Sequence, residues 1–382
     1  MTMKLAFLGC GYVANMYRLT LAMHPELELV AVTDAERSRA ENMARLTGAR
    51  AYPDLDAILA DPAIELVVNL TNPLAHYETT RRCLEAGKHV YTEKPLAMDF
   101  DQARELAALS ARKGLMLCSA PCTLMSEAAQ TLWRAVRDGR VGPVRLVYAE
   151  MEDGMVSRAP VRTWVNEAGT PWPFVNEFET GCTVEHAGYV LTWLVAIFGR
   201  AVSVTAYADT LLEDKVPGQL LASAADYTVA CIKFASGVVV RMTNGIYAEH
   251  DHRLRLFGDE GVLCVADPRS DRSPVTVRRY YSLRRRRALL PWAKKLPLLA
   301  PPDRREIVKY RGSQARDFCR LIADMAQAAK EGRPPYLGAQ FALHVAELTL
   351  ACQNAGRLAA EGRMPYYPST DPGAVAPLSW AA

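Results

Sequence analysis

The chain has 382 residues, of which half are hydrophobic and 23% are charged, so it is long enough for two domains and too apolar for intrinsic disorder. Its net charge of +3 hides a basic stretch between Arg278 and Lys295, without which the remainder is net negative. A general nucleic-acid surface is therefore not expected. Nine cysteines without CxxC pairs, no signal-peptide pattern and no apolar run of about 20 residues predict a cytoplasmic protein with reduced thiols.

The first 120 residues alternate short apolar runs with segments of helical periodicity. We expect strands at Lys4–Leu8, Leu27–Thr33, Leu66–Leu70, His89–Thr92 and Met116–Ser119. The segments between them predict helices near Ala14–Met23, Ser38–Leu46, Leu55–Ala60, Ala75–Ala86 and Phe100–Arg112. This order is typical of βαβ units, which wind into a parallel sheet covered on both faces.

After Pro121 the pattern changes, and a helix at Met125–Arg137 leads into runs typical of an antiparallel sheet. The expected strands are Val144–Glu150, Val202–Ala208, Tyr227–Phe234, Val238–Gly245 and Arg253–Phe257. Further helices are expected near Val184–Phe198, Ala315–Ala329 and Ala339–Ala359. The sequence thus predicts an α/β chain with a doubly wound Rossmann domain at 1–121, an α+β domain with a large open, mainly antiparallel sheet at 122–365, and a tail at 366–382.

A glycine-rich turn follows the first expected strand and opens the first helix. In the run Gly9-Cys10-Gly11-Tyr12-Val13, the first glycine suits a tight turn and the second lets the backbone approach a pyrophosphate. The helix start would offer free N–H groups and the positive end of its dipole to the phosphates. A chance glycine turn is the alternative interpretation.

Asp34 ends the second expected strand, about 20 residues after the turn, at the distance typical of a ribose-binding carboxylate. Such a carboxylate accepts hydrogen bonds from ribose hydroxyls and repels a 2′-phosphate, so NAD is expected in preference to NADP. Arg37 and Arg39 follow closely and keep NADP open as the cofactor. The same position would also suit an N-cap of the next helix.

Two further strand ends carry polar motifs. Thr71-Asn72-Pro73 enters the helix that contains His76, and at the carboxyl edge of a parallel sheet such a turn faces the ligand crevice. A simple capping turn is the alternative. Glu93-Lys94-Pro95 ends the next strand. The predicted cofactor-binding residues are Gly9, Gly11, Tyr12, Val13, Asp34, Thr71, Asn72, His76, Glu93 and Lys94.

The glycine turn, Asp34, Thr-Asn-Pro and Glu-Lys-Pro in this order resemble the glucose-fructose oxidoreductase and inositol dehydrogenase (Gfo/Idh/MocA) family. The resemblance implies a Rossmann domain and a second domain whose open sheet forms part of the substrate site and often an oligomer interface. A homodimer or homotetramer is therefore expected. It also implies that Lys94 lies beside the nicotinamide and the reacting carbon, where an ammonium can stabilise negative charge on the substrate oxygen.

The second half of the family signature lies before and within the helix that ends near Gly199. Anchored on Gly181 and Gly199, the resemblance puts Glu185, Tyr189 and Thr192 where many members have Asp, His and Asp. All three depart from the commonest pattern. Tyrosine at the histidine position resembles the branch that includes glucose-fructose oxidoreductase.

Lys94, Glu185 and Tyr189 are the predicted catalytic residues. Positions 185 and 189 share one helical face, and a nearby ammonium favours a phenolate, so Tyr189 can exchange a proton with the substrate oxygen during hydride transfer. His186 competes for the acid–base role, but neighbouring helical residues diverge by about 100°. We expect His186 to orient Glu185 or a substrate hydroxyl, with a buried structural histidine as the alternative.

The loop before this helix combines aromatic and polar side chains that suit a sugar, although an ordinary rim loop fits as well. The predicted substrate-binding residues are Lys94, Arg162, Trp172, Asn176, Glu185, His186 and Tyr189. No metal site is expected, because the seven histidines show no ligand-spaced cluster with cysteines or carboxylates.

The segment 278–299 interleaves Arg284–Arg287 with leucines and Trp292. This composition suits peripheral contact with an anionic membrane. A flexible insertion and a lid over an anionic substrate are the alternatives.

Together, motifs and resemblance predict an NAD(P)-dependent dehydrogenase or reductase acting on a CH–OH group of a sugar, nucleotide-sugar or cyclitol. Two other functions stay open: a glycosidase or eliminase that retains its NAD and uses it for transient oxidation, and a non-catalytic dinucleotide-binding sensor.

Overall fold

The computed structural model describes residues 2–216, 224–302, 309–310 and 314–382. Its first sheet has six parallel strands in the order β3-β2-β1-β4-β5-β6. The strands are β1 Met3–Leu8, β2 Leu27–Thr33, β3 Arg50–Ala51, β4 Leu66–Asn69, β5 His89–Thr92 and β6 Leu117–Ser119. The helices between them are α1 Ala14–Leu21, α2 Arg37–Thr47, α3 Leu55–Ala60, α4 His76–Glu85 and α5 Phe100–Lys113. This is the predicted doubly wound Rossmann sheet.

The central strands of this sheet are apolar because helices cover both of their faces. Leu5, Phe7, Val67 and Val68 are fully buried. The strand order reverses between β1 and β4, whose last residues pair as Leu8 with Asn69. Ligands of open parallel sheets bind at this reversal, beyond the carboxyl ends of the strands. The glycine turn and the Thr-Asn-Pro turn both start there.

The second sheet has nine strands and is mixed, with β7 and β10 as its parallel pair among otherwise antiparallel neighbours. The strands are β7 Val144–Glu152, β8 Ala201–Asp209, β9 Tyr227–Phe234, β10 Val239–Gly245, β11 Leu254–Gly258, β12 Gly261–Val265, β13 Val275–Leu283, β14 Arg286–Leu289 and β15 Lys294–Lys295. A separate two-stranded pair consists of β16 Lys309–Tyr310 and β17 Gln314–Ala315. The predicted large, mainly antiparallel sheet is confirmed.

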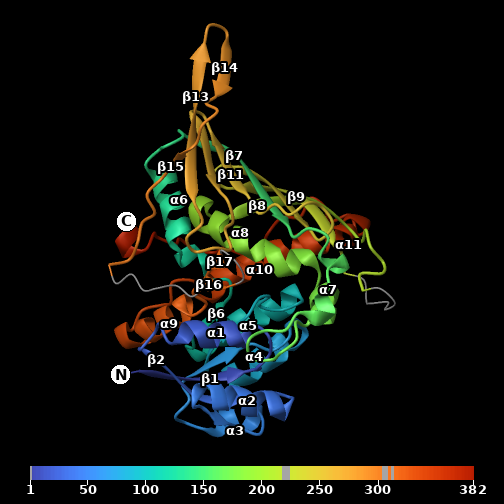
Figure 1. Ribbon diagram of the computed structural model, residues 1–382, viewed down its shortest axis with the longest axis vertical. Helices are drawn as coiled ribbons and strands as arrows, with labels where there is room; N and C mark the ends of the chain where they lie inside the picture. Colours follow the sequence, from blue (N-terminus) through green and yellow to red (C-terminus); the bar gives the residue numbers. More distant parts are fainter. Residues whose placement is uncertain (1, 217–223, 303–308, 311–313) are drawn as a thin grey trace.

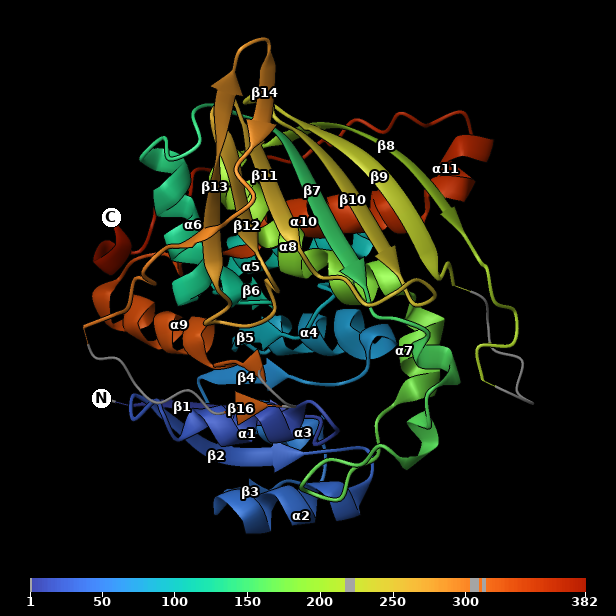
Figure 2. The ribbon, with the colours of Figure 1, turned by 45° about the horizontal axis from the view of Figure 1, so that its top comes forward.

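Helices cover one face of the second sheet and separate it from the Rossmann domain (Figures 1 and 2). The helices in contact with this sheet are α6 Glu127–Arg137, α8 Cys182–Phe198, α10 Ala339–Gln353 and α11 Ala355–Ala360. Two further helices, α7 Phe174–Thr180 and α9 Arg320–Glu331, lie to the sides. Helix α10 contacts both α8 and α5, so a late segment of the chain packs against the Rossmann domain. Gly188 lets α8 approach Pro121 closely, since a Cβ there would lie 3.2 Å from the proline ring.

The tail after residue 365 is tied to the second domain, because Tyr366 and Val204 exchange two backbone hydrogen bonds. All nine cysteines lie in the described residues and are free thiols. No single described helix is long and apolar enough to cross a membrane, although α7 and α8, bent by 74°, meet the length and composition criteria as a pair.

Sequence periodicity missed α7 and the strands β12 to β15. The segment 278–299, for which a flexible insertion was one expectation, instead continues β13 and forms β14 and β15. Its turn consists of arginines and lacks the Asn-Gly or Gly-rich pair that marks most hairpins. Helix α7 has seven residues and no side-chain cap, so its local signal is weak.

One buried guanidinium holds three carboxyl groups between α6, α9 and the loop after β12. The Arg320 side chain, 13% exposed, lies 2.8 Å from Glu127, 3.4 Å from Asp271 and 3.6 Å from Asp317. Asp317 also lies 2.9 Å from His24 of the Rossmann domain. Burial raises the pKa of Asp271 to about 7, against the opposing charge of Arg320. Arg272 also reaches Glu127, at 3.5 Å, so among the described ion pairs Asp271 is the carboxyl group that has Arg320 alone as its partner.

We predict that Arg320→Leu lowers the free energy of unfolding by about 3–5 kcal/mol, because it leaves the buried Asp271 without its ion-pair partner and weakens the pairing of Glu127 and Asp317. Chemical denaturation followed by circular dichroism measures the loss. Arg357→Leu removes an exposed arginine that pairs with Glu361, and this control should leave the midpoint almost unchanged. Equal midpoints for both variants would contradict a structural role of the cluster.

Candidate active site

The glycine turn has both the space and the donors for a pyrophosphate. Gly9 has φ +94°, and a Cβ there would lie 2.6 Å from the Leu70 carbonyl oxygen, so only glycine fits beside the end of β4. A Cβ on Gly11 would meet no atom within 4 Å. The first turn of α1 has no acidic residue and no side-chain cap, which leaves its N–H groups available to an anion.

Asp34 ties the glycine turn to the loop after β2. Its carboxylate accepts hydrogen bonds from the backbone N–H of Cys10 at 2.7 Å and of Glu36 at 2.8 Å. Glu36 is the N-cap of α2, so the capping alternative for Asp34 is not what the structure shows. Arg39 pairs with Glu36 at 2.9 Å, and Arg37 pairs with a glutamate one turn along its own helix. Both arginines therefore already have anionic partners.

The ring of His76 supports the Thr-Asn-Pro turn through contacts with backbone carbonyl groups. Asn72 caps the short 3₁₀ helix Pro73–Ala75 with its side-chain oxygen. The ring of His76 is fully buried, with Nδ1 2.7 Å from the Pro95 carbonyl oxygen and Nε2 3.0 Å from that of Thr71. Burial lowers the pKa of His76. His76 was predicted to bind the cofactor, but its ring connects two loops and does not face the ligand crevice.

Glu93, which directly precedes the predicted catalytic lysine in the sequence, accepts two hydrogen bonds. The phenol of Tyr17, on α1, donates to Glu93 Oε1 at 2.5 Å, and the backbone N–H of Lys94 donates to Glu93 Oε2 at 3.0 Å. Burial and the neighbouring carboxylate raise the pKa of Tyr17, which keeps its proton. Sequence reasoning did not single out Tyr17, which fixes the backbone at Lys94.

Lys94 and Glu185 form an ion pair across the two domains. The Lys94 side chain is 21% exposed and that of Glu185 only 5%. Burial favours a neutral amine, but the charge of Glu185, the largest opposing cause, outweighs it and the pKa of Lys94 is raised. Position 94 therefore carries an ammonium, as charge stabilisation at a substrate oxygen requires.

Glu177 on α7 completes this charge cluster and was not predicted from the sequence. Burial, repulsion by Glu185 and a hydrogen bond with Glu185 raise the pKa of Glu177 well above its usual range, against the opposing effect of Lys94. Two adjacent carboxyl groups cannot both ionise cheaply when only one cation is close. The cluster thus places two carboxyl groups beside one ammonium, and its surroundings favour a proton on Glu177.

Tyr189 lies one helical turn beyond Glu185 and is flanked by Arg316. The Arg316 guanidinium lies over the Tyr189 ring, 4.9 Å from its centroid, and Nη1 donates to the phenol oxygen at 3.4 Å. Nε of Arg316 donates to the carbonyl of Arg269. No carboxylate in the described part of the chain forms an ion pair with Arg316. The structure thus brings Lys94, Glu185 and Tyr189 to one place and adds Arg316, which the sequence did not indicate.

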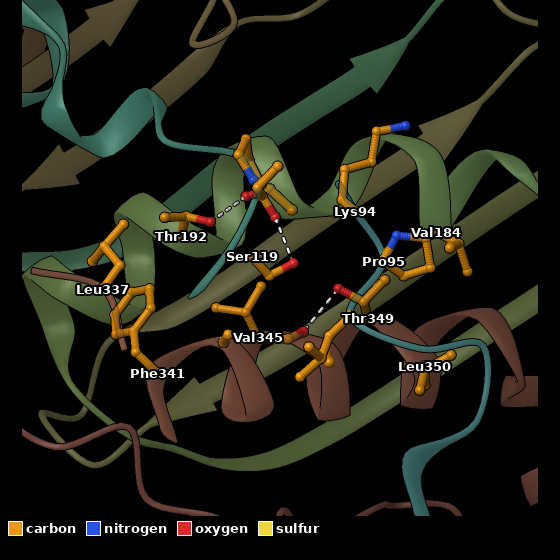
Figure 3. Close-up of a pocket in the computed structure, with 16 residues that line it drawn as sticks. Lys94, Pro95, Ser119, Val184, Thr192, Leu337, Phe341, Val345, Thr349 and Leu350 are labelled. Atoms are coloured by element: carbon orange, nitrogen blue, oxygen red, sulfur yellow. Dashed lines mark hydrogen bonds between the residues drawn. The ribbon is translucent and has the colours of Figure 1, made fainter. Parts of the chain in front are cut away.

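A small, mainly apolar cavity of about 30 Å³ lies behind Pro95, between β6 and the helices α8 and α10. Figure 3 shows the residues that line it. The amino group of Lys94 points away from it. Thr192 lines this cavity, and its hydroxyl donates to the Gly188 carbonyl at 2.6 Å. Thr192 therefore turns back onto α8, although it stands where many members of the predicted family have an aspartate.

His186 has a different partner from the predicted one. Its Nε2 lies 2.8 Å from Asp153, which follows β7, while Glu185 pairs with Lys94. Burial would raise the pKa of Asp153. The charge and the hydrogen bond of His186 outweigh burial, together with a hydrogen bond from His252 and the charge of Arg269, and the pKa of Asp153 lies well below its usual range. The expectation that His186 orients Glu185 is wrong, because residue 186 faces the second sheet.

The fold also gathers a group that sequence spacing did not reveal. Ligand atoms of Asp153, His250 and His252 lie within 4.8 Å of one another, contrary to the expectation that no such cluster exists. Arg269 donates to Asp153 at 3.0 Å and to Nδ1 of His252. The Arg269 guanidinium is thus hydrogen-bonded to two of the three candidate ligands, and its positive charge would repel a metal ion. No sequence pattern indicated this group, because Asp153 is about 100 residues away from the two histidines along the chain.

The predicted substrate loop forms an aromatic cluster beside α7. Trp172 packs against Trp164, with ring centroids 5.0 Å apart, and Arg162 lies over the Phe174 ring at 5.4 Å. Asn176 lies on α7 directly before Glu177. Substrate contacts of Arg162, Trp172 and Asn176 stay predictions.

Comparison with known proteins agrees with this arrangement. Residues 3–120 match the profile described as "Oxidoreductase family, NAD-binding Rossmann fold". Residues 129–264 match the "GFO/IDH/MocA C-terminal domain". The two matches together cover more than half of the sequence. The chain belongs to the Gfo/Idh/MocA oxidoreductase family.

Relatives of this family member are distant in sequence. Trans-1,2-dihydrobenzene-1,2-diol dehydrogenase of Bos taurus is 24% identical over 70% of this chain and 75% of its own length. Aldose-aldose oxidoreductase of Caulobacter crescentus, complexed with glycerol, shares a TM-score of 0.73 at 21% identity over 95% of this chain and 99% of its own. KijD10, a 3-ketoreductase of Actinomadura kijaniata complexed with TDP-benzene and NADP, has a TM-score of 0.72 at 19% identity over 93% and 98%. The chain spans about half the length of some other curated relatives.

We predict that Glu177→Gln flattens the pH dependence of stability. A carboxyl whose pKa is raised on folding binds a proton in the folded state, so wild-type stability falls as the pH rises above its ordinary pKa of about 4.5. The slope is at most about 1.4 kcal/mol per pH unit. Glutamine keeps a neutral hydrogen-bonding group without titrating, so the variant gains stability relative to the wild type with rising pH.

Chemical denaturation at several pH values between about 5 and 8 measures this difference. Glu179→Gln, on the same helix, removes one carboxyl outside the Lys94 cluster and serves as the control. Parallel stability curves for wild type and Glu177→Gln would show that Glu177 is ionised.

Proposed function

We propose that the chain transfers a hydride between a nicotinamide cofactor and a carbinol or ketone carbon of a sugar, nucleotide-sugar or cyclitol. One observation carries the proposal: Lys94, Glu185 and Tyr189 come together beside the strand ends of a nucleotide-binding sheet. Tyrosine at position 189 supports assignment to the branch of the family that has tyrosine in place of histidine.

The nicotinamide dinucleotide would be held by the glycine turn, the start of α1 and Asp34, whose geometry fits it. When bound, it supplies or accepts the hydride. Lys94 Nζ donates a hydrogen bond to the reacting oxygen of the substrate, while Glu185 holds the ammonium in place. In the reductive direction Tyr189 gives its phenolic proton to that oxygen, and in the oxidative direction it takes the proton back.

Arg316 and Glu177 support these two groups. The guanidinium beside the phenol stabilises the negative charge that remains on Tyr189 after proton donation. The raised pKa of Glu177 favours its protonated form, which leaves Glu185 as the main counter-charge of Lys94. A second carboxylate would hold the ammonium more strongly and compete with the substrate oxygen.

The substrate class is supported by relatives that act on similar groups. An aldose-aldose oxidoreductase and a 3-ketoreductase complexed with TDP-benzene share the fold over nearly the whole chain. The homodimer or homotetramer that the family resemblance implies stays a prediction. The outer face of the second sheet, which no helix covers in Figure 2, supports it.

Asp34 favours NAD in this proposal, while NADP is the cofactor bound to KijD10. We expect Asp34→Ser to weaken NADH binding about tenfold, through loss of a charged hydrogen-bond acceptor, and to strengthen NADPH binding through loss of repulsion. Titrations of both nucleotides followed by fluorescence measure the two dissociation constants. Weaker binding of both nucleotides to the same extent would contradict a role of Asp34 in cofactor choice.

Activity is tested with a panel of sugars, cyclitols and nucleotide-sugars, with NAD and NADP, followed by absorbance of the reduced cofactor. On the best substrate, we expect Lys94→Met and Tyr189→Phe each to lower kcat by roughly 10²–10⁴-fold, because each removes one group at the reacting oxygen. NADH binding should stay within about twofold of wild type, since neither side chain is needed to hold the dinucleotide.

His186→Gln, which alters a side chain on the other face of α8, is the matched control and should retain most activity. Turnover of a glycoside without net NADH release would assign the redox-assisted hydrolase instead. Full activity of Lys94→Met would contradict the proposed mechanism, and dinucleotide binding without any turnover would favour a sensor.

A further inference from the structure

A basic hairpin stands out from the second sheet and has no part in the proposed reaction. Strand β12 ends its pairing with β13 at Arg279. Beyond that point, Tyr280–Leu283 pair with Arg286–Leu289 as a two-stranded ladder without a third described strand. Figures 1 and 2 show this hairpin projecting from the sheet, at the opposite end of the molecule from the Rossmann domain. We call residues 280–289 the basic arm.

The tip of the basic arm carries cations that the fold does not neutralise. Arg284, Arg285 and Arg286 are exposed, and none of them forms an ion pair with a carboxylate in the described residues. Arg287 differs, because it lies over the Tyr280 ring at 4.7 Å and donates to the Asp259 carbonyl. Three arginines at the tip are therefore free to meet an external anion.

Arg284 also occupies a strained backbone position. Its φ of 55° makes it the one non-glycine residue with positive φ among the described residues. The left-handed region costs a residue with a Cβ about 1 kcal/mol or more, and hairpin turns usually place Asn or Gly there. A charged side chain kept at such a position points to a use for its charge.

Exposed apolar side chains accompany these cations. Leu283 is 64% exposed and Tyr281 is 43% exposed, whereas Trp292, 68% exposed, lies after β14 at the base of the basic arm. Single exposed apolar residues are common on proteins. Here Leu283 and Tyr281 adjoin three unpaired arginines on a projecting tip, and this combination of cations, a leucine and an aromatic ring is typical of contact with the headgroup region of a bilayer.

We propose that the basic arm docks the protein on a membrane surface that contains anionic lipids. A planar surface suits a single projecting tip, whereas a nucleic-acid footprint needs a broad basic face, and the rest of this chain is net negative. Because the basic arm points away from the Rossmann domain, docking leaves the catalytic crevice uncovered. The proposal does not depend on the proposed hydride transfer.

Co-sedimentation with sucrose-loaded vesicles tests the proposal with the full chain. Vesicles of phosphatidylcholine with about 30% phosphatidylglycerol should pellet the wild-type protein at about 0.1 M salt, and pure phosphatidylcholine vesicles should not. We expect the triple variant Arg284→Ser, Arg285→Ser, Arg286→Ser to lower the partition coefficient on the order of 100-fold, at roughly fivefold per cation. Tyr281→Ser with Leu283→Ser should weaken binding while leaving its salt dependence unchanged.

The matched control removes three exposed arginines elsewhere: Arg104→Ser, Arg137→Ser and Arg357→Ser. It changes the net charge equally and should retain most vesicle binding. Circular dichroism and NADH titration show that each variant is folded. Equal loss in both triple variants, no binding of wild type to anionic vesicles, or tighter binding to duplex DNA than to vesicles would each overturn the proposal.

Discussion

The ion pair between Lys94 and Glu185 is the interaction on which the site depends, because it joins a strand end of one domain to a helix of the other. Removing two charges from water costs several kcal/mol per ion unless their geometry is well fixed. The surroundings provide that fixation. Glu93, held by Tyr17, orients the backbone at position 94, and Glu177, whose pKa is raised, forms a hydrogen bond with Glu185 from α7.

The two domains are joined by charge as well as by apolar packing. Helix α10 contributes Ala342, Leu343 and Ala346 to the Rossmann core, so the second domain cannot move far from the first without exposing apolar surface. The cluster around Arg320 reaches across the same junction through His24. Directional ionic contacts then determine the relative orientation of the two domains, which hydrophobic contact alone specifies weakly.

Local motifs made half of the site predictable from the sequence. The glycine turn, Asp34 and Lys94 follow strands whose carboxyl ends must meet at one edge of a parallel sheet, so topology alone brings them together. Glu177, Arg316 and Asp153 carry no local signal, because their partners lie in other parts of the chain. His186 shows the reverse case. Its sequence neighbourhood suggested the crevice, but helical geometry turns it toward the second sheet.

The pairing of Lys94 with Glu185 is compatible with catalysis because an ammonium has three N–H donors and the carboxylate needs only one. The others stay available to a substrate oxygen, so binding need not break the pair. Tyr189 reaches the same region from the next turn of α8, with Arg316 behind its ring. Positive charge thus lies on both sides of the place where an alkoxide would form, and the single carboxylate is already engaged. This distribution favours an oxygen that gains negative charge over a neutral hydroxyl, as transition-state stabilisation requires.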